Sequence, residues 1–348
     1  MTRPSYSTAN LFMLFLLAYN VLLAITISYL YWGVWQDTPV GEFIGSPWYL
    51  VIHQAIGLLL PMFIFRALSG EYRRDYRQPM THSMSGNPEM ATDGTHFKIA
   101  HYNNKKPLGV VNILLVIALS LLLQPFMMLF SALASLILPN PITGLISELA
   151  LLPIPMALII VALTPAVCEE LVFRGYIQSK YENQPIAVAA VVNGLFFGMI
   201  HMNLHQFAYA FAMGIVFAYM VYYTRSVYSA ILAHFVVNAT QYILGYLSVA
   251  HAPPPDVNDM VVDGAELWQA IGALGLLALF VLPFVAGLFY IFVQHNKRRN
   301  PAPIVPVSII LDDIEALAQA KKAKPQHPFD MAFVAVVIVF VILMVSLM

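Results

Sequence analysis

Nine long apolar segments run through this chain of 348 residues, and they limit its fold more than any other feature. A helix needs about 20 mostly apolar residues to cross a bilayer, and only helices and closed barrels satisfy their backbone hydrogen bonds there. We therefore predict an all-α protein, a polytopic bundle of transmembrane helices with about nine spans. The segments are residues 11–32, 48–68, 110–138, 151–173, 186–201, 205–223, 227–247, 267–293 and 328–348.

The composition supports a membrane protein and excludes other classes. Hydrophobic residues make up 60% of the sequence and charged residues 10%, whereas roughly a quarter of the residues of a soluble domain are charged. The net charge of −1 offers no basic surface to a nucleic acid, so we expect no such partner. A single cysteine, Cys168, excludes an internal disulfide. The first apolar run is too long for a signal-peptide core and has no small-residue cleavage site after it, so we interpret it as a retained span.

The basic residues predict the orientation, because Lys and Arg accumulate in cytoplasmic loops. With nine spans and a cytoplasmic N-terminus, all 17 Lys and Arg fall in cytoplasmic segments, and Arg174 is counted among them at the end of the fourth span. We expect an integral protein of a prokaryotic cell membrane, with its C-terminus outside. The proposed outer loops carry acidic residues instead, namely Asp37, Glu42, Asp256, Asp259 and Asp263.

Two polar segments, residues 69–108 and 294–327, interrupt the spans and suggest three parts. The first part is 1–149, with the first polar segment. The second is 150–247, and the third is 248–348, with the second polar segment. Apolar residues at 309–311, 314, 317 and 318 are spaced for a short amphipathic helix at the membrane surface.

The first of three polar clusters inside the apolar segments is Glu169, Glu170 and Arg174, in the run PAVCEELVFRGY. Ionisable side chains are costly in lipid, so each is a candidate functional residue. Glu170 and Arg174 are four residues apart and can pair on a helix. Glu169 then remains as the free carboxylate, which suits a general base. Alternatively, all three cap the cytoplasmic end of a span.

The other two clusters contain the histidines. His201 follows Phe197 by four residues, and Asn238 follows His234 by four, so each pair shares a helix face. The alternatives are an interfacial position for His201 and hydrogen bonding between helices for His234 and Asn238. Two carboxylates, two histidines and an amide on neighbouring helices suffice for acid–base or metal-assisted hydrolysis.

Other polar or small residues in the spans have a structural interpretation. Cys168 precedes the glutamates, and a nearby carboxylate disfavours a thiolate, so we expect it to pack as a small residue. His53 lacks a partner in the sequence. Gly214 is expected to allow a close approach of two helices.

With these motifs the chain resembles the CPBP family of intramembrane proteases, which includes the type II CAAX prenyl endopeptidases and proteins of bacteriocin processing and self-immunity. The family pattern is Glu-Glu-x-x-x-Arg, then Phe-x-x-x-His, then His-x-x-x-Asn. It occurs here at 169–174, 197–201 and 234–238. The resemblance covers about residues 150–247, which it identifies as a catalytic core of four helices.

The resemblance implies an intramembrane endopeptidase that uses a glutamate-activated water. Glu169 would be the general base and His201 would help to hold the water. His234 and Asn238 would stabilise the oxyanion of the tetrahedral intermediate. Supporting roles fall to Phe197, Glu170 and Arg174, the last two by fixing the helix. The expected partners are membrane lipid and a peptide or lipidated-protein substrate, cut near its C-terminus; the sequence does not indicate the oligomeric state.

Members of the family are also described as metalloproteases. A zinc site formed by Glu169, His201 and His234, with water as the fourth ligand, is chemically reasonable. We favour a metal-free site, because there is no His-x-x-x-His pair and the two histidines lie on different helices. Zinc or another divalent metal remains the alternative cofactor.

Two other functions are compatible with the same residues. One is a non-enzymatic membrane scaffold or bacteriocin self-immunity protein on the same fold. The other is a transporter with a proton relay, but a transporter should show broken helices in both halves. Here the clusters lie in one half.

The predicted site residues should meet in one polar cavity. Counted from Ile186, His201 lies ~22 Å into its span, whereas His234 lies only ~10 Å into its own. To bring them together, the helix of His201 begins below the interface, or it is tilted or short, or the cavity reaches deep into the membrane. We expect the cavity to open toward the cytoplasmic side, because Arg174 and Arg225 mark the ends of its helices.

Overall fold

The computed structural model describes residues 5–71, 108–140, 142–181, 184–251, 264–300 and 328–347. The elements in these ranges are all helices, as predicted. The amphipathic helix predicted at 309–318 lies outside the described residues, as does most of both polar segments.

Several of the helices contain π-helical turns, which are labelled η. In chain order the elements are α1 (Ser5–Leu30), η1 (Tyr31–Trp35), α2 (Pro39–Ile44), α3 (Tyr49–Gln54), η2 (Ala55–Leu59), α4 (Leu60–Leu68), α7 (Val110–Leu122), α8 (Gln124–Ala134), α9 (Ile142–Leu149), α10 (Ile154–Leu158), η3 (Ile159–Leu163), α11 (Thr164–Glu170), η4 (Leu171–Ile177), α12 (Gln178–Lys180), α13 (Ile186–Ile200), α14 (Leu204–Thr224), α15 (Val227–His251), α16 (Gly264–Arg299) and α18 (Met331–Leu347).

Each of the nine apolar segments forms helix, but they are not equally long. Among the described residues, seven helical runs are long and apolar enough to cross a membrane. Two others, Ile186–Ile200 and Met331–Ser346, are apolar but shorter. The seven are Tyr6–Trp35, Tyr49–Leu68, Val110–Ala134, Ile154–Lys180, Leu204–Thr224, Val227–Ser248 and Gly264–Arg299.

The fourth run differs from its predicted bounds in a way that matters for the site. The expected span ended at residue 173, but the helix continues from Ile154 to Lys180 through η3 and η4. Arg174 is therefore not a loop charge at the end of a span. Its side chain is 0% exposed, and its assignment to a cytoplasmic segment was wrong.

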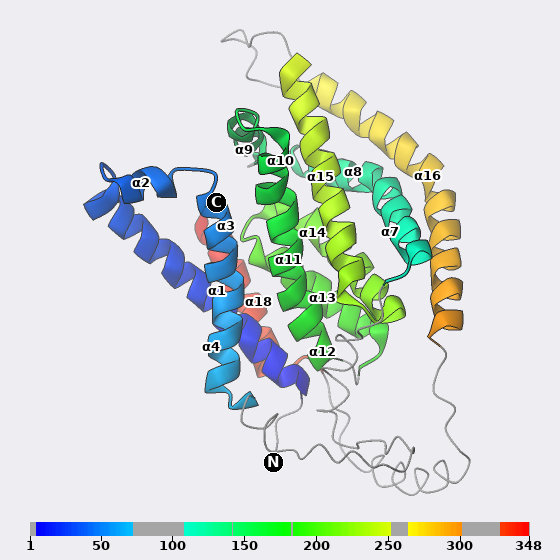
Figure 1. Cartoon of the computed structure of the whole chain (residues 1–348), viewed down its shortest axis with the longest axis horizontal. Coiled ribbons are helices and arrows are strands. Elements are labelled where there is room, and N and C mark those ends of the chain that lie inside the picture. The colour runs from blue at the N-terminus through cyan, green and yellow to red at the C-terminus, as the bar shows by residue number, and fades with distance from the viewer. Residues whose placement is uncertain are drawn as a thin grey trace, which may run out of the picture.

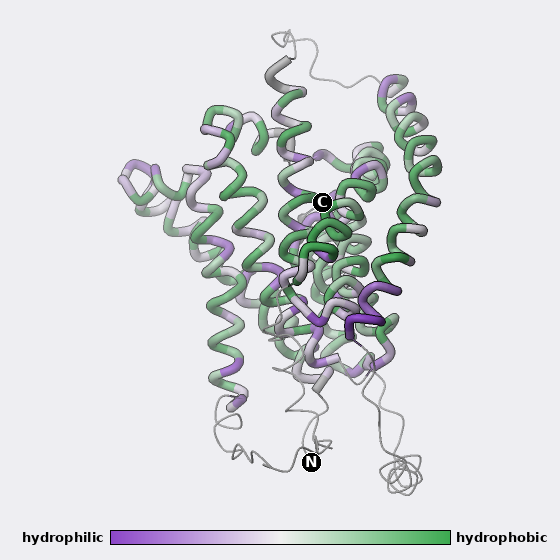
Figure 2. The backbone as a smooth tube through the Cα atoms, turned by 45° about the vertical axis from the view of Figure 1, so that its right-hand side comes forward, coloured by the Kyte–Doolittle hydropathy of each residue, from purple (hydrophilic) through white to green (hydrophobic). Residues whose placement is uncertain are grey.

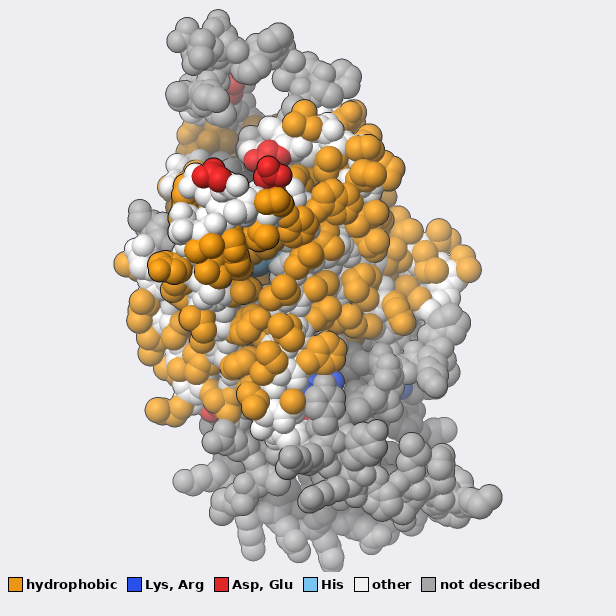
Figure 3. Space-filling model, turned by 60° about the vertical axis from the view of Figure 1, so that its left-hand side comes forward, with side chains coloured by type: hydrophobic (Ala, Val, Ile, Leu, Met, Phe, Trp, Pro, Cys, Tyr) orange, Lys and Arg blue, Asp and Glu red, His pale blue; other side chains and the backbone are white. Residues whose placement is uncertain are grey.

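The exposed apolar side chains identify an integral membrane protein. Figure 2 shows hydrophobic colour along most of the helical lengths and hydrophilic colour mainly near their ends. On the face in Figure 3, hydrophobic side chains form a broad belt, with acidic side chains above it and Lys or Arg at its lower edge. Leu22, Tyr29, Leu276 and Leu279 are all more than half exposed. Such a surface is rare on a soluble monomer and suits contact with lipid.

The central helices α10 to α15 are flanked on both sides (Figure 1). On one side lie α1, α3, α4 and α18, and α18 packs against α1. On the other side lie α7, α8 and α16, with α16 against α8 and α15 against α7.

The hairpin of α13 and α14 contains a very close helix contact. A Cβ atom added at Gly214 would lie 2.5 Å from the Cα of Gly194, so neither position accepts a larger residue without a backbone shift. The predicted close approach at Gly214 is confirmed. Small residues let membrane helices approach in this way because packing drives their association.

Candidate active site

The three charges of the first cluster lie in the middle of the bundle. Glu169 is 6% exposed, and Glu170 and Arg174 are 0% exposed. This burial excludes the alternative in which they cap the end of a span. Arg174 Nη1 donates to Glu170 Oε1 at 2.9 Å, which confirms the predicted pair.

Arg174 is held by more than its carboxylate. Its Nη2 donates to the carbonyl of Gly214 at 3.2 Å, and its guanidinium lies over the rings of Phe197 and Phe217, 4.3 and 5.4 Å from their centroids. Buried charges need such partners because their hydration is lost. Arg174 thus ties the helix of Glu169 to α14.

His234 reaches the same carboxylate from α15. Its Nδ1 lies 2.8 Å from Glu170 Oε1, and since a carboxylate accepts, Nδ1–H donates. The other ring nitrogen, Nε2, then points toward Glu169, 4.0 Å from Oε2. Glu170 therefore orients a second residue besides Arg174, a role that the sequence did not reveal because it joins residues 64 positions apart.

Glu169 has one engaged and one open carboxylate oxygen. Oε1 accepts from Gln54 Nε2 at 3.2 Å. Oε2 is buried and has no hydrogen-bond partner among the described residues. Gln54 was not predicted as a site residue. The polar pair His53–Gln54 within an apolar span could have indicated it.

His201 lies just beyond the last residue of α13 and contacts the same aromatic ring as His234. Its Nδ1 donates to the carbonyl of Phe197 at 2.8 Å, which leaves Nε2 as its second nitrogen. Both imidazoles stand nearly perpendicular to the Phe197 ring, at centroid distances of 5.2 Å for His201 and 5.8 Å for His234. The two histidines, predicted at different depths, thus pack against one phenylalanine.

Asn238 hydrogen-bonds to a backbone carbonyl that a proline leaves free on the neighbouring helix. Pro165 lacks the N–H that would donate to the carbonyl of Val161 one turn earlier. Asn238 Nδ2 donates to this carbonyl instead, at 3.0 Å. One N–H of the amide group is used in this way, and the second is left for other partners.

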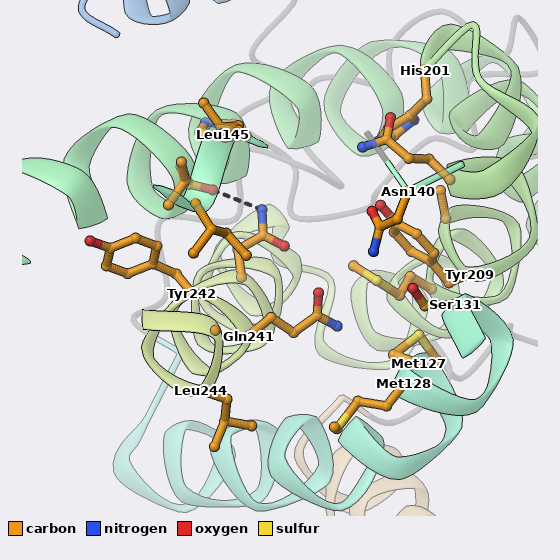
Figure 4. Close-up of a pocket in the computed structure, with 18 of the residues that line it drawn as sticks. Met127, Met128, Ser131, Asn140, Leu145, His201, Tyr209, Gln241, Tyr242 and Leu244 are labelled. Carbon is orange, nitrogen blue, oxygen red and sulfur yellow. Dashed lines mark hydrogen bonds between the residues drawn. The ribbon is translucent and has the colours of Figure 1, made fainter. Parts of the chain in front are cut away.

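One cavity of about 860 Å³ is lined by all four predicted catalytic residues, Glu169, His201, His234 and Asn238. Figure 4 shows its walls, with Gln241 extending into the hollow and the hydrogen bond of Asn238 as a dashed line. A smaller cavity of about 190 Å³ lies on the other side of Glu169. Further polar residues line the larger one and were not predicted: His53, Gln54, Ser131, Ser135, Asn140, Gln206, Tyr209, Gln241 and Ser248.

The cavity extends in the direction opposite to the one expected. Its walls reach Asn140, Ser248 near the end of α15, and Leu267 near the start of α16. Lys180 and the basic end of α16 lie at the other end of the bundle, where the N-terminus is also drawn (Figure 1). The expectation of an opening at the basic end was wrong, because Arg174 does not mark an end of its helix.

The predicted zinc ligands do not fit a metal ion as they are placed. No three His, Cys, Asp or Glu side chains in the described ranges come close enough to hold one. Each histidine uses its Nδ1 in a hydrogen bond, which leaves Nε2 as the nitrogen that could face a metal.

This geometry defines a class: a polytopic membrane protein with a buried carboxylate–imidazole site in a cavity. Residues 151–240 match a family model described as "Type II CAAX prenyl endopeptidase Rce1-like". All three motifs fall within that range. The resemblance of this core to the CPBP family of intramembrane proteases, seen in the sequence, is thus confirmed.

A curated relative is similar over the same part of the chain. Over 86 residues the chain is 28% identical to "Putative membrane peptidase YdiL" of Bacillus subtilis (strain 168). The matched segment is 24% of this chain and spans about a third, 35%, of that protein. No solved structure matches the chain.

Proposed function

We propose that this protein is an intramembrane endopeptidase in which Glu169 activates water to hydrolyse a peptide bond. One observation supports this most: Glu169 lines the cavity, and its Oε2 is buried, lacks a hydrogen-bond partner among the described residues and lies 4.0 Å from His234 Nε2. A carboxylate in such a site is suited to general-base catalysis. The family match and the name of the curated relative support the same class of reaction.

In this mechanism Glu169 Oε2 takes a proton from a water that also bonds to His201 Nε2. The water oxygen attacks the peptide carbonyl, and the oxyanion forms. When the intermediate collapses, the C–N bond breaks and Glu169 returns its proton to the leaving amine. Gln54 keeps the carboxylate of Glu169 in place through Oε1.

The oxyanion is stabilised from α15. Arg174 and His234 both bond to the carboxylate of Glu170, which fixes the ring of His234. The second N–H of Asn238 then serves as a donor to the oxyanion, and so does His234 Nε2 when it carries a proton. We propose that the reaction needs no metal, since no three of the described His, Cys, Asp or Glu side chains lie close enough together to hold one.

The test is cleavage of internally quenched apolar peptides by the purified full chain in detergent. We expect Glu169→Gln to abolish cleavage, because it removes the base and keeps the size. Asn238→Ala should retain some activity, since an oxyanion donor contributes typically ~10²–10³ in rate. Cleavage should persist after dialysis against EDTA.

The matched control is Glu148→Gln, an exposed glutamate of α9 outside the cavity. It should cleave at the wild-type rate, and all variants should stay monodisperse in detergent. A wild-type rate for Glu169→Gln would contradict the glutamate mechanism and direct attention to Glu170 or a metal. A wild-type chain that cleaves no peptide would favour the scaffold or self-immunity alternative.

A further inference from the structure

The walls of the large cavity are apolar and carry almost no charge. Glu169 is the one acidic residue among those that line it, and none of the lining residues described is Lys or Arg. Methionine side chains form much of the wall facing Gln241 (Figure 4). Flexible, apolar methionines adapt to varied apolar ligands.

Polar groups occur along the same walls at intervals. Ser131, Asn140, Gln206 and Gln241 are among the residues that line the cavity. An extended peptide inside a membrane protein must find partners for every backbone N–H and C=O. Neutral amides and hydroxyls spaced along an apolar wall supply both donors and acceptors without adding charge.

The missing cations limit which part of a peptide can bind. A C-terminal carboxylate would enter a cavity with no Lys or Arg among its described lining residues, only the histidines His53, His201 and His234, and with Glu169 already present. Two carboxylates in a dry site repel each other, and an unpaired buried charge is strongly disfavoured. An internal, uncharged stretch of peptide meets no such penalty.

We propose that this cavity takes an uncharged, apolar stretch of a membrane peptide in extended form, cut at an internal bond and admitted from the end of the bundle opposite the basic segments. The proposal rests on the proposed function, because it names the substrate of that site. Since Lys and Arg mark the cytoplasmic side, the admitting end faces outward.

The side of access is tested with single cysteines in a Cys168→Ala background. Asn140→Cys lies at the far end of the cavity and Ser131→Cys within it; Lys297→Cys, exposed near the basic end of α16, is the control. An impermeant maleimide added to intact cells should label the first two and label the control only after permeabilisation. Labelling of Ser131→Cys only after permeabilisation, or of Lys297→Cys in intact cells, would overturn the outward access.

The chemical class is tested by protection of Ser131→Cys from maleimide in detergent. The probe is a leucine–alanine peptide, acetylated and amidated, compared with the same peptide bearing a free C-terminal carboxylate. We expect the neutral peptide to slow maleimide labelling at concentrations at least tenfold lower than the peptide with a free carboxylate. Glu169→Gln should reduce this difference between the two peptides. Equal or better protection by the free carboxylate would overturn the proposal.

Protection is read from labelling rates and requires no cleavage. A peptide that protects but is not cut would therefore contradict the proposed function and leave the substrate class standing. A peptide that is cut but enters from the basic end would support the proposed function and contradict the proposed side of access.

Discussion

At the scale of single residues, one carboxylate oxygen organises the buried charges of the site. Glu170 Oε1 accepts from both Arg174 Nη1 and His234 Nδ1, and these donors come from two different helices. Glu169, the next residue, instead accepts from Gln54 through Oε1, and its Oε2 lies 4.0 Å from His234 Nε2. Two adjacent glutamates thus have separate roles, one structural and one proposed as the base, because their side chains leave the helix about 100° apart.

Gln54 provides a sharp test of this arrangement. Gln54→Ala removes the hydrogen bond to Oε1 of Glu169, and a hydrogen bond to a charged group contributes ~1.5–3 kcal/mol, or roughly 10- to 150-fold. We expect kcat to fall within that range while KM changes little, because the residue positions the base. The matched control is Gln36→Ala, because Gln36 is an exposed glutamine that does not line the cavity. A loss expressed mainly in KM would show that Gln54 binds substrate instead.

At the scale of the elements, close packing and caps hold the helices that carry the site. The Gly194–Gly214 contact brings α13 against α14, and the carbonyl of Gly214 is also the acceptor for Arg174. At the start of α18, Asp330 Oδ1 accepts from the N–H of Phe333 and from Asn10 of α1. The bond to Phe333 caps α18, and the other contacts link different helices.

Gly214→Ala should destabilise the protein. The added Cβ would lie 2.5 Å from the Cα of Gly194, so backbone must shift; overpacking of this kind costs about 1–3 kcal/mol. The control is Gly275→Ala in α16, where a Cβ has nothing within 4 Å. Thermal unfolding in detergent should show a lower Tm for the first variant and an unchanged or higher Tm for the second. Equal Tm values would mean that the hairpin can relax freely.

Asp330→Ala should loosen α18 from α1, because it removes a cap that typically contributes ~1 kcal/mol. Burial raises the pKa of Asp330, but hydrogen bonds from Ser7, Phe333, Asn10 and Ala332 outweigh it and hold the pKa below its ordinary value of 3.8. The carboxylate therefore stabilises the fold above that pH, and this contribution disappears as the pH falls through the lowered pKa. Thermal unfolding in detergent at pH 7 should give a lower Tm for Asp330→Ala than for wild type. Asp330→Asn keeps an acceptor, so its Tm should fall less. A difference that grows toward pH 3 would contradict this assignment.

At the scale of the whole molecule, the family core does not make the cavity alone. Residues 151–240 carry the motifs, but the walls also come from α3, α8, α9 and the start of α16. Among these, α3 and α8 flank the core on opposite sides in Figure 1. The flanking helices thus complete the site as well as covering it.

This predicts the behaviour of the isolated core. A fragment of residues 150–247 lacks Gln54 and the apolar lining residues of α3, α8, α9 and α16, so it should aggregate in detergent or fail to cleave the peptides that the full chain cleaves. Size-exclusion chromatography and the quenched-peptide assay measure both properties. A monodisperse, fully active fragment would show that the flanking helices are dispensable and would support 150–247 as an independent domain.

The sequence by itself determined the helices and the local pairs. Apolar length predicts a helix wherever the backbone must satisfy its own hydrogen bonds in lipid, and spacings of four residues place Glu170 beside Arg174 and Phe197 beside His201. These features depend on neighbours within a turn or two, which the order of residues fixes directly. The nine apolar segments and the three motifs are therefore evident from the amino-acid sequence alone.

Only the tertiary structure decided which groups meet across the bundle. The contacts of Glu170 with His234 and of Glu169 with Gln54 join residues 64 and 115 positions apart. The carbonyl of Val161 accepts from Asn238, 77 positions further along the chain. The burial of Arg174 and the direction of the cavity depend on how whole helices pack, which no local spacing encodes, and this is why the opening was predicted at the wrong end.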